Sequence, residues 1–259
     1  YEYPYLFTEP EFLGGSNFNA ETKPLPTDEQ LDELRLAAQN GGLKYNNPID
    51  IELHSNSQIT IEEQTPGGGW RLVCCWRWVY ENNRTITHNV YISSFNGVIS
   101  SSENITINGE LNGMLTVHSE KGIEITGDLT YVDHPLENEN SDDMLGLVSE
   151  GNVTVDEFAH QDNGYRDLTI HASIMALEKS FSVEEYNQGN PRGELTLLGG
   201  IIQETRGAVG TFSGGTSRSG YIKNYSYDER LLRMHPPSFP RESFFNIFYW
   251  KDRVVSRTP

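Results

Sequence analysis

A short segment of alternating apolar residues occurs twice in this chain, and the spacing of the two copies constrains the fold more than any other feature. ITINGEL at 105–111 aligns with IEITGDL at 123–129, an offset of 18 residues. Each copy is too short to bury an apolar face in an ordinary sheet. Stacked coils solve this problem, because each coil buries its inward side chains against those of its neighbours. The repeat predicts an all-β fold, a right-handed parallel β-helix (solenoid), with Ile105 over Ile123 and Ile107 over Ile125.

Further short alternating pieces follow the repeat, each bounded by glycine, asparagine or aspartate. They lie at 115–117, 145–148, 153–155, 168–174, 181–183 and 195–197. The alternative fold is a β-sandwich, which would join the same strands as antiparallel hairpins. The regular internal offset favours the solenoid.

The chain before the repeat has a different character. Thr27 is an N-cap with Gln30 three residues later, and the stripe Leu31, Leu34, Ala37 and Ala38 ends at Gly41-Gly42, which predicts one helix. Strands are expected at 49–53, 59–61, 70–80 and 85–92, with turns at 66–69 and 81–83, as a meander of antiparallel hairpins.

We expect one structural unit with four parts. A linker and an N-terminal capping helix occupy 1–48, and a β-hairpin region packed on the solenoid occupies 49–95. The solenoid coils occupy 96–210, and an aromatic C-terminal tail that caps the coils or lies along their flank occupies 211–259. The caps are expected because a stack of coils exposes unpaired strand edges at both ends.

The formal net charge of −18 excludes two classes of partner. A surface this acidic repels phosphate backbones and anionic lipid headgroups, so neither nucleic acid nor a membrane surface is expected to bind. The chain has no apolar run long enough to cross a bilayer. Because it starts at Tyr1, we expect an upstream signal or anchor to be missing, so that contact with a membrane would come only through that anchor.

The two cysteines, Cys74 and Cys75, are adjacent in the sequence LVCCWRW. Neighbours on a strand point to opposite faces, so the two thiols cannot share a metal site without distortion, and a disulfide between them needs a strained turn. We interpret them as core-filling thiols. Their oxidation state is left open.

Several segments resemble those of a bacterial family of secreted domains of unknown function, described as pilus-assembly or PilX-like. They include SFNGVI at 94–99, GDLTY at 127–131, DMLGLV at 143–148, ASIMA at 172–176, RGAVG at 206–210, YSYDERL at 225–231 and PPSFP at 236–240. The resemblance implies a prepilin-like N-terminal anchor that is absent here, and a location outside the cell or in the cell envelope of a bacterium. It also implies display on a type IV pilus-like machine, with pilin-like or envelope proteins as partners.

The chemical motifs favour a non-catalytic structural or adhesive protein. The sequence has no Gly-x-Ser-x-Gly elbow and no His-Glu-x-x-His motif, so we expect no catalytic and no cofactor-binding residues. The alternative is a carbohydrate-binding protein or a carbohydrate-active lyase or glycosidase. Its two required carboxylates would come from acids in or beside turns, which are Asp128, Asp133, Asp142, Asp143, Asp156, Glu157 and Asp162.

Two further groups are candidate binding residues. The acidic stretch from His134 to Asp143 is expected to protrude as a loop, and its carboxylates are the candidates for a Ca²⁺ site, since Ca²⁺ takes six to eight oxygen ligands. These candidates are Asp133, Glu137, Glu139, Asp142 and Asp143. Trp70, Trp76 and Trp78 alternate on one expected strand and share a face, where they would fill the core or, if exposed, stack on sugar rings of surface glycans.

Overall fold

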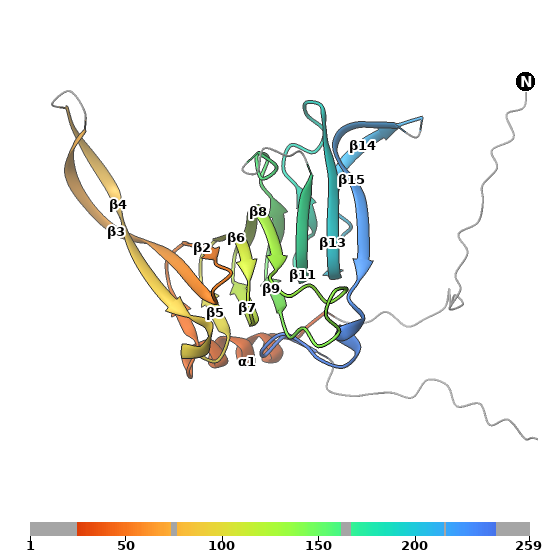
Figure 1. The fold of residues 1–259 in the computed structure, drawn as a ribbon. Helices are drawn as coiled ribbons and strands as arrows, with labels where there is room; N and C mark the ends of the chain where they lie inside the picture. The colour runs from red at the N-terminus through yellow and green to blue at the C-terminus, as the bar shows by residue number, and fades with distance from the viewer. Residues whose placement is uncertain (1–24, 74–76, 162–166, 215, 242–259) are drawn as a thin grey trace, which may run out of the picture.

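The computed structural model describes residues 25–73, 77–161, 167–214 and 216–241, and between 68 and 83 it describes the strand backbone alone. The described residues lie mostly in strands, and one large sheet curls into a half-barrel (Figure 1). The expectation of an all-β protein is confirmed. None of the described helices is long and apolar enough to span a membrane.

The helix α1 (Asp28–Gln39) precedes the sheet. The strands before the repeat are β1 (Leu43–Tyr45), β2 (Ile49–Leu53), β3 (Gln58–Val73) and β4 (Arg77–Tyr91), followed by a 3₁₀ turn at Ile92–Ser94. The central strands are β5 (Val98–Ser101), β6 (Ile105–Leu111), β7 (Met114–Ser119), β8 (Gly122–Tyr131), β9 (Met144–Ser149) and β10 (Asn152–Val155). The last are β11 (Leu168–Ala176), β12 (Phe181–Val183), β13 (Pro191–Gln203), β14 (Gly210–Ser213) and β15 (Thr216–Tyr227), with a 3₁₀ turn at Glu229–Leu232.

The pairing of the two repeat copies agrees with the sequence expectation. β6 and β8 are parallel, with Ile105 opposite Ile123 and Ile107 opposite Ile125. The same ladder continues to β2 on one side and to β10 and β12 on the other. The inward side chains of this ladder are buried, and they are Ile49, Ile51, Ile105, Ile107, Ile123, Ile125, Val153, Val155, Phe181 and Val183.

A second ladder of parallel strands runs through β5, β7, β9, β11 and β13. Its inward residues Ile99, Val117, Leu147 and Ile174 occupy one register and join the same core. The hairpin pairing that a β-sandwich requires does not occur among these strands. Antiparallel pairs in the described part of the chain are confined to β2–β3, β3–β4 and β14–β15, which contradicts the sandwich alternative for 96–210.

The hairpin region differs in detail from the expectation. β3 and β4 form one long antiparallel hairpin that leaves the sheet at one side (Figure 1). The turn expected at 66–69 is an irregularity within β3, and the turn expected at 81–83 lies within β4, because pairing of the two long strands satisfies the backbone there. The strand expected over 70–80 is divided between β3 and β4. Near the base of the hairpin, Ile59 and Ile61 are buried against the core, as expected for a region packed on the strands.

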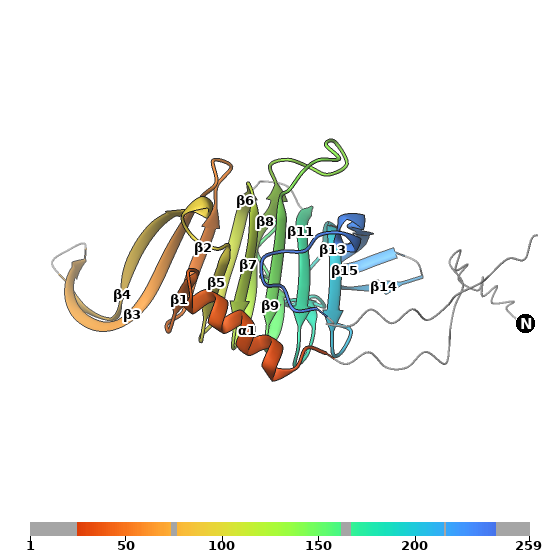
Figure 2. The same cartoon turned by 90° about the horizontal axis from the view of Figure 1, so that it is seen from below.

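The helix occurs at the residues expected from the sequence. It lies on a face of the sheet, whereas a cap over one end was expected. Thr27 and Gln30 form the expected capping box, and Leu31, Leu34 and Ala38 are buried. These residues pack with Val98, Val148 and Met175, which are outward residues of β5, β9 and β11. Figure 2 shows α1 crossing these strands. α1 therefore covers a face of the sheet, in addition to touching the edge strand β1, and is not simply an end cap.

The C-terminal region is only partly a tail. Gly210–Ser213 and Thr216–Tyr227 are strands of the sheet, and β15 pairs with β13 in parallel. The segment after them crosses the outer face beside α1 (Figure 2), where the hydroxyl of Thr116 donates to the carbonyl of Pro237. Phe239 packs against the α1 cluster, which agrees with a tail along the flank. Phe244 to Trp250 lie outside the described residues.

Candidate functional site

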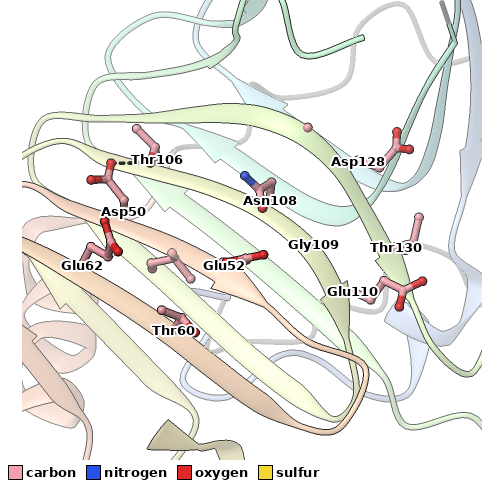
Figure 3. A pocket seen from close by; sticks show the side chains of 12 residues that line it. Asp50, Glu52, Thr60, Glu62, Thr106, Asn108, Gly109, Glu110, Asp128 and Thr130 are labelled. Carbon is pink, nitrogen blue, oxygen red and sulfur yellow. Dashed lines mark hydrogen bonds between the residues drawn. The ribbon is translucent and has the colours of Figure 1, made fainter. Parts of the chain in front are cut away.

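A hollow of about 770 Å³ lies on the outer face of β2, β3, β6 and β8. We call it the acidic groove (Figure 3). Period-two alternation creates it: the isoleucines of these strands point into the core, so the residues between them point outward. Its carboxylates are Asp50, Glu52, Glu62, Glu110 and Asp128, and its other polar side chains are Thr60, Thr106, Asn108 and Thr130.

Hydrogen bonds within the protein hold some carboxylates of the groove in place, while other carboxylates are exposed to a ligand. The Thr106 hydroxyl donates to one oxygen of Asp50 at 2.6 Å, and the Gln64 amide donates to the other at 3.1 Å. The backbone N–H of Thr169 donates to Asp128 at 2.8 Å. Glu52 and Glu110 are exposed. Because the lining includes no basic side chain, the groove is suited to a cationic group or to a ligand that donates many hydrogen bonds.

A second group of acids lies on the same ladder. Glu124 of β8 is in register with Thr106 of β6, and Asp156 and Glu184 follow β10 and β12. One carboxylate oxygen from each of these three acids lies within 4.8 Å of the others. Burial raises the pKa of Glu124 above its ordinary value, and the charges of Glu184, Asp156 and Asp50 raise it further. Three carboxylates are a partial ligand set for Ca²⁺, which takes six to eight oxygens.

The calcium candidates expected from the sequence do not form such a group in the described part of the chain. The carboxylate of Asp143 accepts the backbone N–H groups of Gly113 at 2.6 Å and Asp133 at 2.7 Å. Asp133 accepts the side-chain amide of Asn138 at 2.6 Å. The remaining candidates, Glu137, Glu139 and Asp142, are exposed. The structure uses Asp133 and Asp143 to hold the loop together, because a buried backbone N–H needs an acceptor.

Another contact ties this loop to the C-terminal segment. Arg230 donates to the carbonyl oxygen of Ser141 at 3.0 Å and pairs with Asp228 at 2.7 Å. The protruding loop expected from the sequence is therefore anchored at its base by a guanidinium group.

The tryptophans expected to form one face are divided between two strands. Trp70 is on β3, opposite Tyr80, and Trp78 is on β4, opposite Leu72. Trp76, Cys74 and Cys75 lie outside the described residues. The sugar-stacking role of Trp70, Trp76 and Trp78 stays a prediction.

Comparisons of the chain with protein-family models, curated proteins and solved structures give no match. The function must be inferred from the chemistry of the chain itself.

A buried network that sequence reasoning missed connects β5, β7 and the end of β9. The Ser100 hydroxyl lies 2.9 Å from Nδ1 of His118, and Nε2 of His118 lies 2.9 Å from a carboxylate oxygen of Glu150. Arg35 of α1 pairs with the same carboxylate and lies 3.4 Å from Glu120. A signal was present, because Ser100 and His118 are 18 residues apart, the same offset as the repeat.

The network has the Ser–His–carboxylate order of a nucleophilic triad, but its burial favours a structural role. Ser100 is 1% exposed and His118 is fully buried, so α1 and the neighbouring strands separate the hydroxyl from any substrate. Glu150 links this buried pair to Arg35. The arrangement therefore fixes the position of α1 on the sheet.

This network makes the attachment of α1 sensitive to acid. Burial by itself would raise the pKa of Glu150, but the hydrogen bond from His118 and the charge of Arg35 outweigh it and hold the pKa below the ordinary 4.5. A carboxyl group whose pKa is lowered by folding stabilises the fold above its unfolded pKa, and this contribution is lost as the pH falls through the folded pKa. We expect Glu150→Gln to flatten the loss of thermal stability below pH 4.5, measured by circular dichroism.

The matched control for this experiment is Glu139→Gln, since Glu139 is an exposed acid of the 133–143 loop. It should retain the wild-type pH profile. An unchanged profile in Glu150→Gln would mean that Glu150 does not hold α1 through its charge.

Proposed function

We propose that this chain is a stiff, non-catalytic module of a bacterial surface assembly, in which the parallel strands stack as coils of a right-handed solenoid. The observation that carries the proposal is the register of β2, β6, β8 and β10, whose inward aliphatic residues meet from strand to strand. Such stacking gives neighbouring coils a shared hydrogen-bonded ladder and a shared core. A body of this kind resists bending and is suited to present a surface or to hold an attached element at a distance.

Two features support a role in display. The β3–β4 hairpin projects from one side of the sheet, where it is available to a partner (Figure 1). The segments that resemble PilX-like secreted domains support a location outside the cell or in the envelope, with pilin-like or envelope proteins or surface glycans as partners. The net charge of −18 argues against nucleic acid.

The proposal predicts that the parallel ladders open as one unit. We expect the amides of β6, β8, β9 and β11 to share one free energy of opening, which falls with urea together with the global free energy of unfolding, because these strands share one core. The measurement is hydrogen exchange with mass spectrometry over a series of urea concentrations. The β14–β15 hairpin is the internal control and should exchange earlier, since β14 is partly exposed throughout. Ladder strands that open one by one at low urea would contradict a stiff module.

A second candidate function is binding or cleavage of a carbohydrate in the acidic groove. The observation that favours it is the set of carboxylates around Asn108, because a glycosidase needs two carboxylates that flank the scissile bond. A glycan array and an assay for released reducing ends separate the two candidates. Binding that is lost in Glu52→Gln, with no cleavage, supports an adhesive module, whereas cleavage lost in Glu52→Gln or Glu110→Gln makes the chain an enzyme.

A further inference from the structure

β4 and β15 are among the strands with an unpaired outer backbone edge in the described residues. β1 and β12 also pair on one side only, but α1 contacts β1, and the N–H of Val183 in β12 donates to the carbonyl of Ala208. From β4 the sheet passes through β3, β2, β6, β8, β11 and β13 to β15. β4 pairs with β3 on one side, and its other side carries no strand. β15 pairs with β13, while β14 covers its other side only as far as Gly220. The N–H of Tyr221 donates to the carbonyl of Val209 at 2.8 Å, so the unpaired outer edge of β15 runs from Ile222 to Tyr227 and is a template for another strand.

The core is also open beside β15. Tyr221 is fully buried, but Tyr225 and Tyr227, which share its side of the strand, are 37% and 56% exposed. Next to them lies a hollow of about 350 Å³, lined by Phe181, Ile201, Val209 and Tyr225 among others. Tyr225 and Tyr227 are exposed because, in the described part of the chain, no further strand follows β15 and covers them. A stack of repeats needs a cover at such an end to bury its last apolar layer.

The charge of this end is opposite to that of most of the chain. The strands β14 and β15 contain two basic residues, Arg218 and Lys223, and no acidic residue, a net charge of +2. Residues 25–203 contain nine basic and 28 acidic residues, a net charge of 9 − 28 = −19. The β4 end is weakly negative, since β2, β3 and β4 contain five acidic and three basic residues, a net charge of 3 − 5 = −2. The two ends therefore attract each other.

We infer that β15 of one copy of this chain pairs with β4 of a second copy, head to tail, so that one sheet continues across both molecules. The free stretches, Ile222–Tyr227 and Arg84–Tyr91, have similar lengths. Pairing of β15 with another β15 would bring two basic ends together, which costs free energy. A head-to-tail contact leaves one edge free at each end of the pair, so association is open-ended. This self-association surface goes beyond the proposed function and does not depend on it.

The test uses full-length chains whose edges are blocked by lysine, a side chain that protects natural edge strands. One variant carries Ile222→Lys and Tyr227→Lys on β15, and the other carries Thr87→Lys and Tyr91→Lys on β4. All four positions are exposed, so folding should be retained, as circular dichroism will check. The control carries Leu136→Lys and Phe158→Lys, two exposed apolar positions outside both edges. Sedimentation velocity is measured from about 1 µM to about 1 mM protein, at low and at high salt.

The expected result is a concentration-dependent series of oligomers for wild type and control, weakened by salt because the two ends carry opposite charge. Each blocked variant should show a dissociation constant at least about tenfold higher. An equimolar mixture of the two variants should form 1:1 dimers and nothing larger, because each chain retains one working edge.

Three results would overturn the inference. A wild-type chain that stays monomeric at every concentration would do so. Dimers abolished only by the β15 substitutions would indicate pairing of β15 with β15. Association that appears only when Phe245→Ser and Phe248→Ser are introduced would assign the β15 edge to the C-terminal residues of the same chain.

Discussion

Replacing Ile125 with alanine is expected to lower the free energy of unfolding by about 2–5 kcal/mol, the range for removal of a buried isoleucine side chain. Ile125 is fully buried and lies in register between Ile107 of β6 and Val155 of β10. The cavity left by the substitution would open between successive strands of the ladder, where neither neighbour can move without breaking its own pairing. Urea denaturation followed by circular dichroism measures the loss. Glu110→Ala, at an exposed position of β6, should change stability by less than about 0.5 kcal/mol.

The double variant Ile107→Ala with Ile125→Ala tests the contact itself. Residues in contact show a coupling free energy of about 0.5–3 kcal/mol in a double-mutant cycle, whereas independent sites add. We expect coupling in this range, because both side chains border one cavity. Strict additivity would show that the two isoleucines do not meet, and the stacking interpretation would then fail.

Gly109→Ala is expected to be a severely damaging small substitution, lowering the free energy of unfolding by about 3 kcal/mol or more. Gly109 has φ +109°, and a Cβ placed there would lie 2.2 Å from the carbonyl oxygen of Leu53 on β2. The backbone conformation alone costs an alanine about 1–3 kcal/mol. The contact adds to this cost, since the opposing atom belongs to the backbone of a paired strand and cannot turn away.

The matched control is Gly189→Ala. Gly189 also has a positive φ, +68°, but nothing lies within 4 Å of an added Cβ. It isolates the conformational cost from the steric one. Equal losses at the two positions would mean that β2 and β6 are not held as close as their pairing indicates.

The sequence predicted the parallel register of the two repeat copies correctly, and it could do so for this pair of strands alone. Ile105 and Ile123 are separated by a short connection, so their equivalence is visible as an 18-residue offset. The next strands in the ladder carry Val153 and Phe181, at offsets of 30 and 28 residues. Longer loops, including the one closed by Asp133 and Asp143, stand between these strands and hide the period.

The candidate sites were less accessible to sequence reasoning. The acidic groove combines residues of four strands. The sequence of one strand does not show whether the neighbouring strands place acidic or basic side chains beside its outward carboxylates. Ser100 and His118 were within reach, because the repeat offset relates them, but Glu150 and Arg35 join them only through packing of α1. The division of Trp70 and Trp78 between two strands was missed because the sequence does not reveal where the long hairpin turns.

The sequence by itself determined the local elements: the capped helix from Asp28, the alternating strands and the shared register of β6 and β8. These follow from capping and from the two-residue period of a strand, which depend on near neighbours alone. The tertiary structure decided which strands pair over long loops, which face α1 covers, and that one side of β4 and part of one side of β15 are left unpaired. Those outcomes depend on how much apolar surface the whole chain buries, and no local sequence pattern specifies that amount.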